Sequence, residues 1–330
     1  MKILVIRFSS IGDIVLTSPV LRCLKQQVGA EVHFLTKKNF ACIVQSNPYV
    51  DKVFGLDRSL YRVIALLRRQ DYDYILDLHH NLRSWWVKLA LQRPSRSFYK
   101  ANLEKWLLVN LKVDVMPDRH VVYRYLETAQ EFGVRYDGQG LDYFIPSGQE
   151  VDIERWEGPS PPFIAFAIGA NHATKRLPTD KIAEICRLLE LPVILLGDQN
   201  DALRGEEVVR QVGSRVFNAC GRLTLHQSAS IIRQAVIVLA HDTGLMHIAA
   251  AFRKPILSFW GNTVPRFGMY PFYPDGTNPH TIFEVKELPC RPCSKLGYRQ
   301  CPKGHFRCMN DLNPHLIAAT ANEQCRAFQA

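Results

Sequence analysis

The sequence predicts an α/β protein made of two doubly wound, Rossmann-like domains that face each other across a cleft. Short apolar runs alternate with helix-length stretches along both halves of the 330-residue chain, a pattern typical of parallel sheets covered on both faces. A segment rich in glycine and proline interrupts this alternation once, at residues 137–162. We therefore expect one domain at residues 1–150 and a second at residues 151–330, a division that the chain length also favours.

The elements of the first half follow from the spacing of apolar residues. Ile3–Ile6 is a near-continuous apolar run and predicts a buried strand, whereas Asp13–Gln26 has apolar residues at helical spacing. The same reasoning predicts further strands at Glu31–Thr36, Lys52–Leu56, Tyr74–Leu78 and Ser95–Tyr99. It predicts further helices at Phe40–Gln45, Leu60–Arg69, Leu82–Leu91 and Val121–Phe132.

The second half repeats this alternation, and several of its strands end at a glycine. The predicted strands are Phe163–Ile168, Pro192–Leu196, Val216–Ala219, Val236–Ala240 and Ile256–Trp260. The predicted helices are Asp180–Leu189, Ala202–Val212, Leu225–Gln234 and Gly244–Phe252. Doubly wound sheets bind ligands outside the carboxyl ends of their strands, so the loops that follow the strands should carry the site.

The composition indicates a cytoplasmic protein. No apolar run approaches the ~20 residues needed to cross a bilayer. Arg7 and Asp13 interrupt the first apolar stretch too early for a signal peptide. The cysteine count is nine, and an odd number without a signal peptide argues for reduced thiols.

The formal charge of +10 is unevenly placed along the chain. Residues 58–124 hold 13 Lys/Arg against 6 Asp/Glu. The same stretch carries the aromatic residues Trp85, Trp86, Phe98, Tyr99 and Trp106. Basic residues interleaved with aromatics are typical of surfaces that bind nucleic acid or an anionic membrane, and a solvated basic face is the plainer alternative.

The first motif, Arg7–Asp13, joins the first predicted strand to the first helix. Its spacing is not that of a phosphate-binding P-loop, and with one glycine it is not a dinucleotide fingerprint. Asp13 could simply cap the helix, as aspartate does well. A carboxylate at this edge of the sheet could also take a proton from an incoming hydroxyl within about 3 Å.

The second motif is the loop Gly169–Pro178, which leaves the first strand of the second half. It combines small residues with Asn171, Thr174, Lys175 and Arg176. Two cations in such a loop are suited to neutralise a departing pyrophosphate. A solvated basic loop is the alternative.

The third motif, His241–His247, lies between a buried strand and a helix that starts near Gly244. The free N–H groups of that first helical turn favour an anionic phosphate. Asp242 is anionic itself and is better suited to accept hydrogen bonds from sugar hydroxyls. The alternative is a capped helix in which His247 satisfies a core hydrogen bond.

Two weaker signals lie in the first half. Asp71-Tyr72-Asp73 has the form of a D-x-D metal motif, but it precedes a strand and so lies at the wrong edge of a doubly wound sheet. The segment Asp77–Arg83 follows a strand at the correct edge. Its polar side chains could reach a substrate there, or remain on the surface.

Four cysteines near the C-terminus form a separate cluster, namely Cys290, Cys293, Cys301 and Cys308. The first two have the spacing of metal ligands, so zinc binding is one interpretation, with His305 as a substitute ligand. The second two are spaced too widely for a typical zinc ribbon. We favour reduced thiols that pack a loop, and we expect no metal at the reaction centre.

Together the three motifs resemble those of glycosyltransferase family nine, the heptosyltransferases that transfer heptose from ADP-heptose to the lipopolysaccharide core. The resemblance extends from Met1 to about Leu312. It implies the GT-B architecture, with an acceptor-binding first domain and a donor-binding second domain. Asp13 matches the proposed catalytic base, and Lys175 matches the phosphate-binding lysine. Asn171 stands where some members carry one of a pair of threonines.

The resemblance, with the motifs above, assigns the following site residues. The catalytic residue is Asp13. The donor-binding residues are Asn171, Thr174, Lys175, Arg176, Asp242, Thr243, Gly244, Leu245 and His247. The acceptor-side residues are Ser10, Gly12, His79, Asn81 and Arg83.

The implied reaction is inverting and metal-independent, requires no cofactor, and moves a heptose or related sugar from an ADP-sugar to a lipopolysaccharide core or similar glycolipid. We expect the protein to be peripheral at the inner face of the cytoplasmic membrane, with an anionic membrane surface and no nucleic acid as partner. Two alternatives remain: a nucleotide-sugar epimerase or hydrolase of the same fold, and a zinc-containing nucleic-acid-binding protein.

Overall fold

The computed structural model describes residues 1–329 and divides the chain into two compact units. Unit 1 comprises Met1–Ala101, Asp118–Phe144 and Phe272–Gly276. Unit 2 comprises Asn102–Pro117, Ile145–Pro271 and the chain from Thr277 onward. The units therefore interleave along the sequence, whereas the expected division at residue 150 follows chain order alone.

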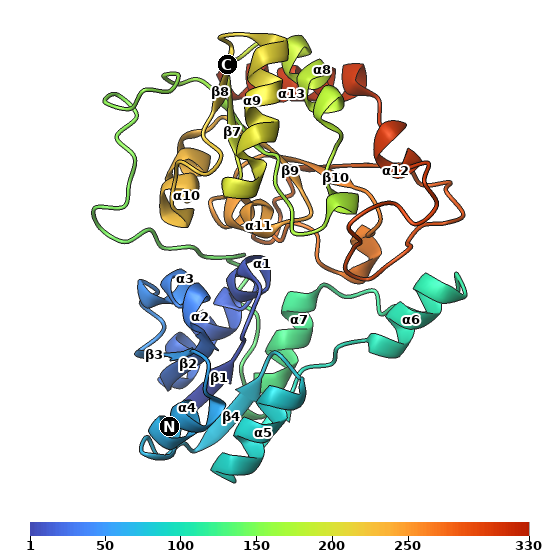
Figure 1. Cartoon of the computed structure of the whole chain (residues 1–330). Coiled ribbons are helices and arrows are strands. Elements are labelled where there is room, and N and C mark those ends of the chain that lie inside the picture. The colour runs from blue at the N-terminus through green and yellow to red at the C-terminus, as the bar shows by residue number, and fades with distance from the viewer. Residues whose placement is uncertain (330) are drawn as a thin grey trace. The chain divides into compact units, whose positions relative to one another are not determined.

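Unit 1 contains a five-stranded sheet in the order β3-β2-β1-β4-β5, and all of its strand pairs are parallel (Figure 1). Its strands are β1 (Lys2–Ile6), β2 (Glu31–Lys37), β3 (Lys52–Leu56), β4 (Tyr74–Asp77) and β5 (Ser95–Ser97). Its helices are α1 (Ile11–Val15), α2 (Ser18–Val28), α3 (Cys42–Gln45), α4 (Leu60–Arg68), α5 (Leu82–Leu91) and α7 (Val121–Leu126), with 3-10 turns η1 (Lys38–Phe40) and η2 (Glu127–Phe132). Leu4 and Ile6 of β1 share one buried cluster with Val63 of α4 and Val87 of α5.

The predicted helix Asp13–Gln26 is wrong in one respect, because the chain forms two helices there. α1 ends at Val15 and α2 begins at Ser18, with Thr17 as its N-cap. Pro19, in the first turn of α2, has no N–H to donate to the carbonyl oxygen of Val15, so the hydrogen-bond ladder of one continuous helix is interrupted there. The predicted helix Val121–Phe132 also changes character, since it is α-helical only to Leu126 and 3-10 beyond.

A buried arginine attaches the first part of the predicted linker to unit 1. Arg22 of α2 is fully buried, and its guanidinium contacts the carboxylates of Asp137 and Asp142. It also donates a hydrogen bond of 2.9 Å to the carbonyl oxygen of Gly140. A buried guanidinium needs such partners to offset its desolvation, which explains why this glycine-rich stretch is ordered against α2.

Unit 2 contains a six-stranded parallel sheet in the order β11-β10-β9-β6-β7-β8 (Figure 1). Its strands are β6 (Ile164–Ala167), β7 (Val193–Leu196), β8 (Val216–Asn218), β9 (Ile237–His241), β10 (Ile256–Trp260) and β11 (His280–Glu284). Its helices are α6 (Asn102–Asn110), α8 (Thr179–Leu188), α9 (Ala202–Val212), α10 (Leu225–Gln234), α11 (Gly244–Ala251), α12 (Arg307–Asn310) and α13 (Pro314–Gln329), with 3-10 turns η3 (Ala173–Lys175), η4 (Gln199–Asp201) and η5 (Pro265–Phe267). The edge strand β11 and helices α6, α12 and α13 were not predicted.

Both units are doubly wound, which confirms the predicted fold class. In each sheet the strand order reverses beside the first strand of the unit, between β1 and β4 and between β6 and β9. The loops leaving these neighbouring strands run in opposite directions and open a crevice at the carboxyl edge. The predicted motifs follow these strands.

Among the described helices, none combines the length and the apolar character needed to cross a membrane.

Candidate active site

The first half-site lies at the carboxyl edge of the unit 1 sheet and is organised by Arg7. This residue follows β1, and its Nη2 atom lies 2.5 Å from Oδ1 of Asp13. The same guanidinium donates hydrogen bonds to the carbonyl oxygens of Ser9 and Leu78, the latter residue directly following β4. One mostly buried cation therefore ties the loops after β1 and β4 to the Asp13 carboxylate.

Asp13 lies in the first turn of α1, and its second carboxylate oxygen is held by Ser10. The Oδ2 atom accepts hydrogen bonds from the backbone N–H of Ser10 at 3.0 Å and from its hydroxyl at 2.7 Å. Ser10 is the N-cap residue, so Asp13 occupies the third helical position rather than the cap itself. The carboxylate remains partly exposed and is fixed in orientation, as a general base must be. Gly12 is buried within the same turn.

His79 completes this half-site. Its ring makes an edge-to-face contact with Phe8, at 5.1 Å between centroids. Burial, together with the positive charges of Arg7 and Lys100, lowers the pKa of His79 to about 4, against an opposing effect of Asp13. The imidazole is therefore neutral at pH 7. Its Nδ1 atom is buried and has no hydrogen-bond partner among residues 1–329.

The other predicted acceptor-side residues have different surroundings. Asn81 is the N-cap of α5, and its side-chain oxygen accepts a 3.0 Å hydrogen bond from the backbone of Ser84. That oxygen is therefore committed to the helix. Arg83 lies exposed in the first turn of α5. The structure thus brings Ser10, Asp13 and His79 together.

The turn that carries His79 is fixed by a buried carboxylate, Asp77. It accepts hydrogen bonds from the backbone N–H groups of His79 and His80, at 3.1 and 2.7 Å. The hydroxyl of Ser84 donates to it at 2.8 Å, and Lys88 lies 3.2 Å away. Asp77 has no lone pair left for substrate chemistry, so its role is to orient the turn.

The second half-site lies between β6 and β9 at the carboxyl edge of the unit 2 sheet. Lys175 and Asp242 form an ion pair of 2.5 Å between Nζ and Oδ2. Thr263 donates a 3.0 Å hydrogen bond to the same carboxylate oxygen. Because both charged side chains are largely shielded from water, an anionic ligand in this crevice would compete directly with Asp242 for the lysine.

The N-terminus of α11 lies beside this ion pair in the sequence and in the fold. Thr243 is the N-cap residue, and Gly244 and Leu245 form the first turn, whose N–H groups have no partners within the helix. The Thr243 hydroxyl is buried and unpartnered within the described residues, as is the side-chain nitrogen of Asn262. Unpartnered donors beside a lysine and a helix N-terminus suit a diphosphate.

Three of the predicted donor residues are buried or are held by contacts within the protein. Thr174 is buried; its hydroxyl accepts a hydrogen bond from the Tyr298 backbone at 2.8 Å and donates to Asn262 at 3.0 Å. Arg176 donates to the carbonyl of Ala170 at 2.7 Å and pairs with the buried Asp201 at 3.4 Å. His247 is buried, near His280 of β11. Asn171 is exposed on the loop.

Several residues that position this half-site were missed. His241 accepts a 2.9 Å hydrogen bond from the Leu177 backbone and so ties the Gly169–Pro178 loop to β9. Burial, with a smaller effect of the Arg204 charge, lowers the pKa of His241 to about 3, which keeps this acceptor neutral. Thr263 and Asn262 follow β10, one strand further along the sheet. The sequence signal that could have identified Asn262 and Thr263 is their position as a polar pair after the predicted strand Ile256–Trp260.

The cysteine cluster shows no metal-binding geometry. All nine cysteines are free thiols, and the Cys290 sulfur lies 3.8 Å from Nε2 of His305. Across residues 1–329, no group of three or more His, Cys, Asp or Glu side chains is arranged to hold a metal ion. Burial raises the pKa of Cys308 to about 12.

In the D-x-D segment, Asp71 pairs with Arg93, and Asp73 accepts a hydrogen bond from the Lys2 backbone.

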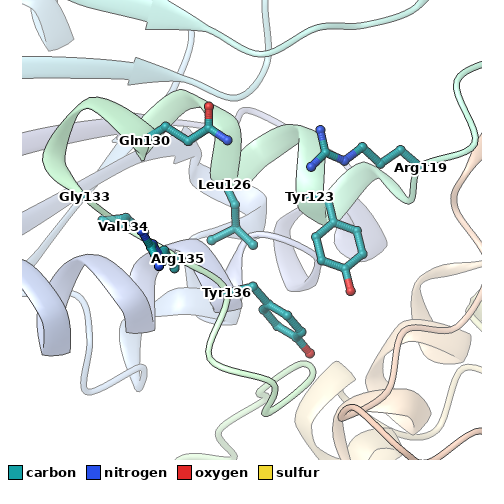
Figure 2. A pocket seen from close by; sticks show the side chains of 8 residues that line it. All are labelled: Arg119, Tyr123, Leu126, Gln130, Gly133, Val134, Arg135 and Tyr136. Atoms are coloured by element: carbon teal, nitrogen blue, oxygen red, sulfur yellow. The ribbon is translucent and has the colours of Figure 1, made fainter.

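A separate pocket lies on unit 1. It is formed by α7, η2 and the chain that follows, and Figure 2 shows the side chains that line it. The rings of Tyr123 and Tyr136 pack edge to face at 5.4 Å between centroids, and Figure 2 shows both on the same side of Leu126. None of the predicted site residues lines it. Gln27 at the end of α2 contacts Arg135, which places this part of the pocket wall toward the amino edge of the sheet.

Comparisons with known proteins agree with this fold. The family model described as glycosyltransferase family 9 (heptosyltransferase) matches residues 60–300. Lipooligosaccharide heptosyltransferase 2 of Haemophilus influenzae is 24% identical, with 98% of this chain and 99% of the relative covered. Lipopolysaccharide heptosyltransferase 1 of Pseudomonas aeruginosa is 26% identical, with 96% of each covered.

Solved structures show the same architecture. The structure of Escherichia coli ADP-heptose lipopolysaccharide heptosyltransferase II matches with a TM-score of 0.77 at 21% identity, over 100% of both chains. A dodecameric iron-containing heptosyltransferase, TibC from enterotoxigenic E. coli, matches with a TM-score of 0.61 at 12% identity, over 99% of this chain and 77% of that chain. The family match spans most of the sequence and includes the Lys175 and Asp242 half-site. The chain therefore belongs to glycosyltransferase family nine and is a glycosyltransferase of the GT-B architecture.

Proposed function

We propose that the enzyme transfers a heptose from ADP-heptose to a lipopolysaccharide core or similar glycolipid, with inversion at the anomeric carbon and without a metal ion. The relatives named above act as lipopolysaccharide or lipooligosaccharide heptosyltransferases. The observation that carries the proposal is the Lys175–Asp242 ion pair beside the N-terminus of α11. We assign donor binding to the second domain and acceptor binding to the first.

The donor half-site supplies charge for the leaving group. A diphosphate that enters the crevice accepts hydrogen bonds from the first turn of α11 and attracts Lys175 away from Asp242. The carboxylate of Asp242 is then available to the hydroxyl groups of the sugar, while Thr263 holds it in place. As the bond to ADP breaks, Lys175 and the helix N-terminus stabilise the negative charge that develops.

The acceptor half-site supplies the base. Asp13 takes the proton of the acceptor hydroxyl as its oxygen attacks the anomeric carbon from the face opposite ADP, which inverts the configuration. Arg7 and Ser10 fix the direction of the carboxylate. The neutral His79 ring adds no positive charge beside this carboxylate. Transfer requires both half-sites to act on one donor–acceptor pair.

Metal independence follows in this proposal from the positive charge that the protein provides. Lys175 and the N–H groups of α11 occupy the place where a bound cation would otherwise neutralise a diphosphate. We also propose that the protein works as a peripheral enzyme at the inner face of the cytoplasmic membrane, where a lipid-anchored acceptor is presented.

The test is an assay of ADP release from ADP-heptose, with and without a heptose-acceptor glycolipid and with and without EDTA. We expect release that depends on the acceptor and persists in EDTA, and a product of inverted anomeric configuration by NMR. Equal ADP release without acceptor would indicate a hydrolase instead. Activity that is lost in EDTA and restored by zinc or iron would contradict the metal-independent mechanism.

A further inference from the structure

Helix α5 carries two apolar faces, and only one of them packs against the protein. Ser84 and Val87 are buried toward the sheet. On the other side, four large apolar side chains are exposed, with accessible fractions of 80, 50, 54 and 48% for Leu82, Trp85, Trp86 and Leu89. Their positions i, i+3, i+4 and i+7 form one continuous stripe along the helix. The two tryptophan rings pack against each other at 5.3 Å between centroids, and each remains about half exposed.

The neighbouring helix extends this surface. α4 packs beside α5, and Nε of Arg68 donates a 3.2 Å hydrogen bond to the carbonyl of Ala90. α4 also exposes Tyr61 and Leu66. We call the exposed sides of these two helices the α4–α5 face. Large exposed apolar side chains on two packed helices mark a candidate interaction site.

The charges around the α4–α5 face are almost all positive. Five exposed arginines border it, namely Arg58, Arg62, Arg68, Arg69 and Arg83. Within the described part of the chain, none of the five pairs with a carboxylate. Three of the four acids between residues 57 and 93 are engaged elsewhere, by Arg93, by Lys88 and by the Lys2 backbone. Asp57 is the fourth acid and is exposed.

We propose that the α4–α5 face is a docking surface for an anionic lipid bilayer, in which the α5 stripe enters the interfacial region and the arginines contact lipid phosphates. Tryptophan and tyrosine rings are favoured at this depth, and a helix with an apolar stripe between basic residues lies in the plane of the interface. Each arginine near an anionic surface strengthens binding. A second copy of this chain would present the same unpaired arginines and be repelled, so charge complementarity favours the membrane.

The position of α5 in the fold relates this surface to the acceptor half-site. α5 begins at Leu82, three residues after His79, at the carboxyl edge where Asp13 lies. Docking along the stripe would therefore hold that edge of unit 1 at the bilayer surface, where the head group of a membrane-anchored acceptor is found. The idea that docking brings the acceptor half-site to its substrate rests on the proposed glycolipid acceptor, whereas the proposed binding to lipid does not.

The first test is co-sedimentation of the full-length protein with vesicles of phosphatidylcholine containing about a third phosphatidylglycerol, compared with pure phosphatidylcholine. The double variant Trp85→Ser/Trp86→Ser should lower the partition coefficient at least 10-fold. Arg62→Gln and Arg69→Gln should each lower it about 5-fold, and raised salt should weaken binding. The matched control is Leu203→Gln, which removes an equally exposed leucine from α9 in unit 2 and should bind as the parent does.

The second test measures insertion. In a Trp106→Phe/Trp156→Phe background the remaining tryptophans are the α5 pair and Trp260, which is buried. Lipids brominated along their acyl chains should quench this fluorescence in anionic vesicles. Thermal unfolding of each variant checks that the fold is retained, which is expected because every altered side chain of the face is exposed.

The outcomes separate the docking surface from the transfer reaction. Unchanged partition of the tryptophan variant, equal binding to neutral vesicles, or concentration-dependent dimerisation through this face would overturn the proposal. Turnover with a deacylated, water-soluble acceptor should be the same in the stripe variants and the parent. If the parent shows no transfer at all but binds vesicles as described, the proposed function fails while the docking surface stands.

Discussion

Replacing Lys175 by methionine should lower kcat/KM for the sugar donor by about 10²–10³-fold, because this lysine carries the positive charge of the donor half-site. Its ammonium lies 2.5 Å from the Asp242 carboxylate, and the two side chains are only 17% and 13% exposed. In so shielded a place a charge about 4 Å from a phosphate oxygen is worth about 4 kcal/mol at an effective dielectric of about 20. That value sets an upper limit near 10³-fold, and the α11 amides, which remain, reduce it.

The assay for Lys175→Met is steady-state ADP release with the donor varied at saturating acceptor. The matched control is Lys286→Met, which removes an exposed lysine of the same unit and should leave both kinetic constants unchanged. Thermal unfolding should show a modest loss of stability, since the partly buried Asp242 loses its ionic partner but keeps the Thr263 hydrogen bond.

A double-mutant cycle separates the two possible roles of this lysine. If Lys175 acts on the diphosphate, Lys175→Met should still cost at least about 10-fold in an Asp242→Asn background. If it serves only to neutralise Asp242, its effect should vanish once that carboxylate is gone. A vanishing effect, or a single variant within about threefold of the parent, would refute the reasoning.

Three further predictions concern Asp13, His79 and Arg22. Asp13→Ala should lower kcat at least about 10²-fold, while ADP-heptose binding, followed by calorimetry, stays near normal. The control Asp73→Ala, at the other edge of the sheet, should have no effect. Normal turnover by the Asp13 variant would remove Asp13 from the catalytic role. His79 has a pKa of about 4 in the fold, below its ordinary value near 6.5, so the unfolded chain binds a proton first as pH falls. The free energy of unfolding should therefore decrease from about pH 7 toward pH 4, and His79→Gln should flatten this pH dependence in denaturant titrations. Parallel slopes for the variant and the parent would contradict this prediction. Arg22→Leu should cost about 3–5 kcal/mol in urea unfolding, because it strands the carboxylate of Asp137 against a buried helix; a loss below about 1 kcal/mol would show that the pair is dispensable.

The alternation of apolar runs was sufficient to predict the doubly wound sheets, because strand burial and helix periodicity are local properties of the chain. The predicted positions of the five strands in each half agree closely with β1–β5 and β6–β10. The edge strand β11 was missed since only one of its five residues is buried, which leaves little apolar signal. The break between α1 and α2 could have been predicted from Pro19.

The candidate site was only partly predictable, because its contacts join residues that are distant in the sequence. The motifs placed Asp13, Lys175 and Asp242 at the correct edges of their sheets. No local pattern shows that Lys175 meets a carboxylate 67 residues away, or that Arg176 is engaged by the buried Asp201. Asn81 illustrates a second limit, since an asparagine after a strand serves equally as a ligand or as a helix cap, and only the structure distinguishes them.

The two half-sites differ in the cation that accompanies each aspartate, and this difference fits their proposed roles. Arg7 and Lys175 both lie 2.5 Å from a carboxylate at the switch point of a doubly wound sheet. The guanidinium of Arg7 is planar and is held by two further carbonyl oxygens, so it fixes the Asp13 carboxylate in one orientation. The ammonium of Lys175 is a single charge on a flexible stem, which can leave Asp242 for a phosphate and return when ADP departs. A base needs a permanent partner, whereas a leaving-group site needs an exchangeable one.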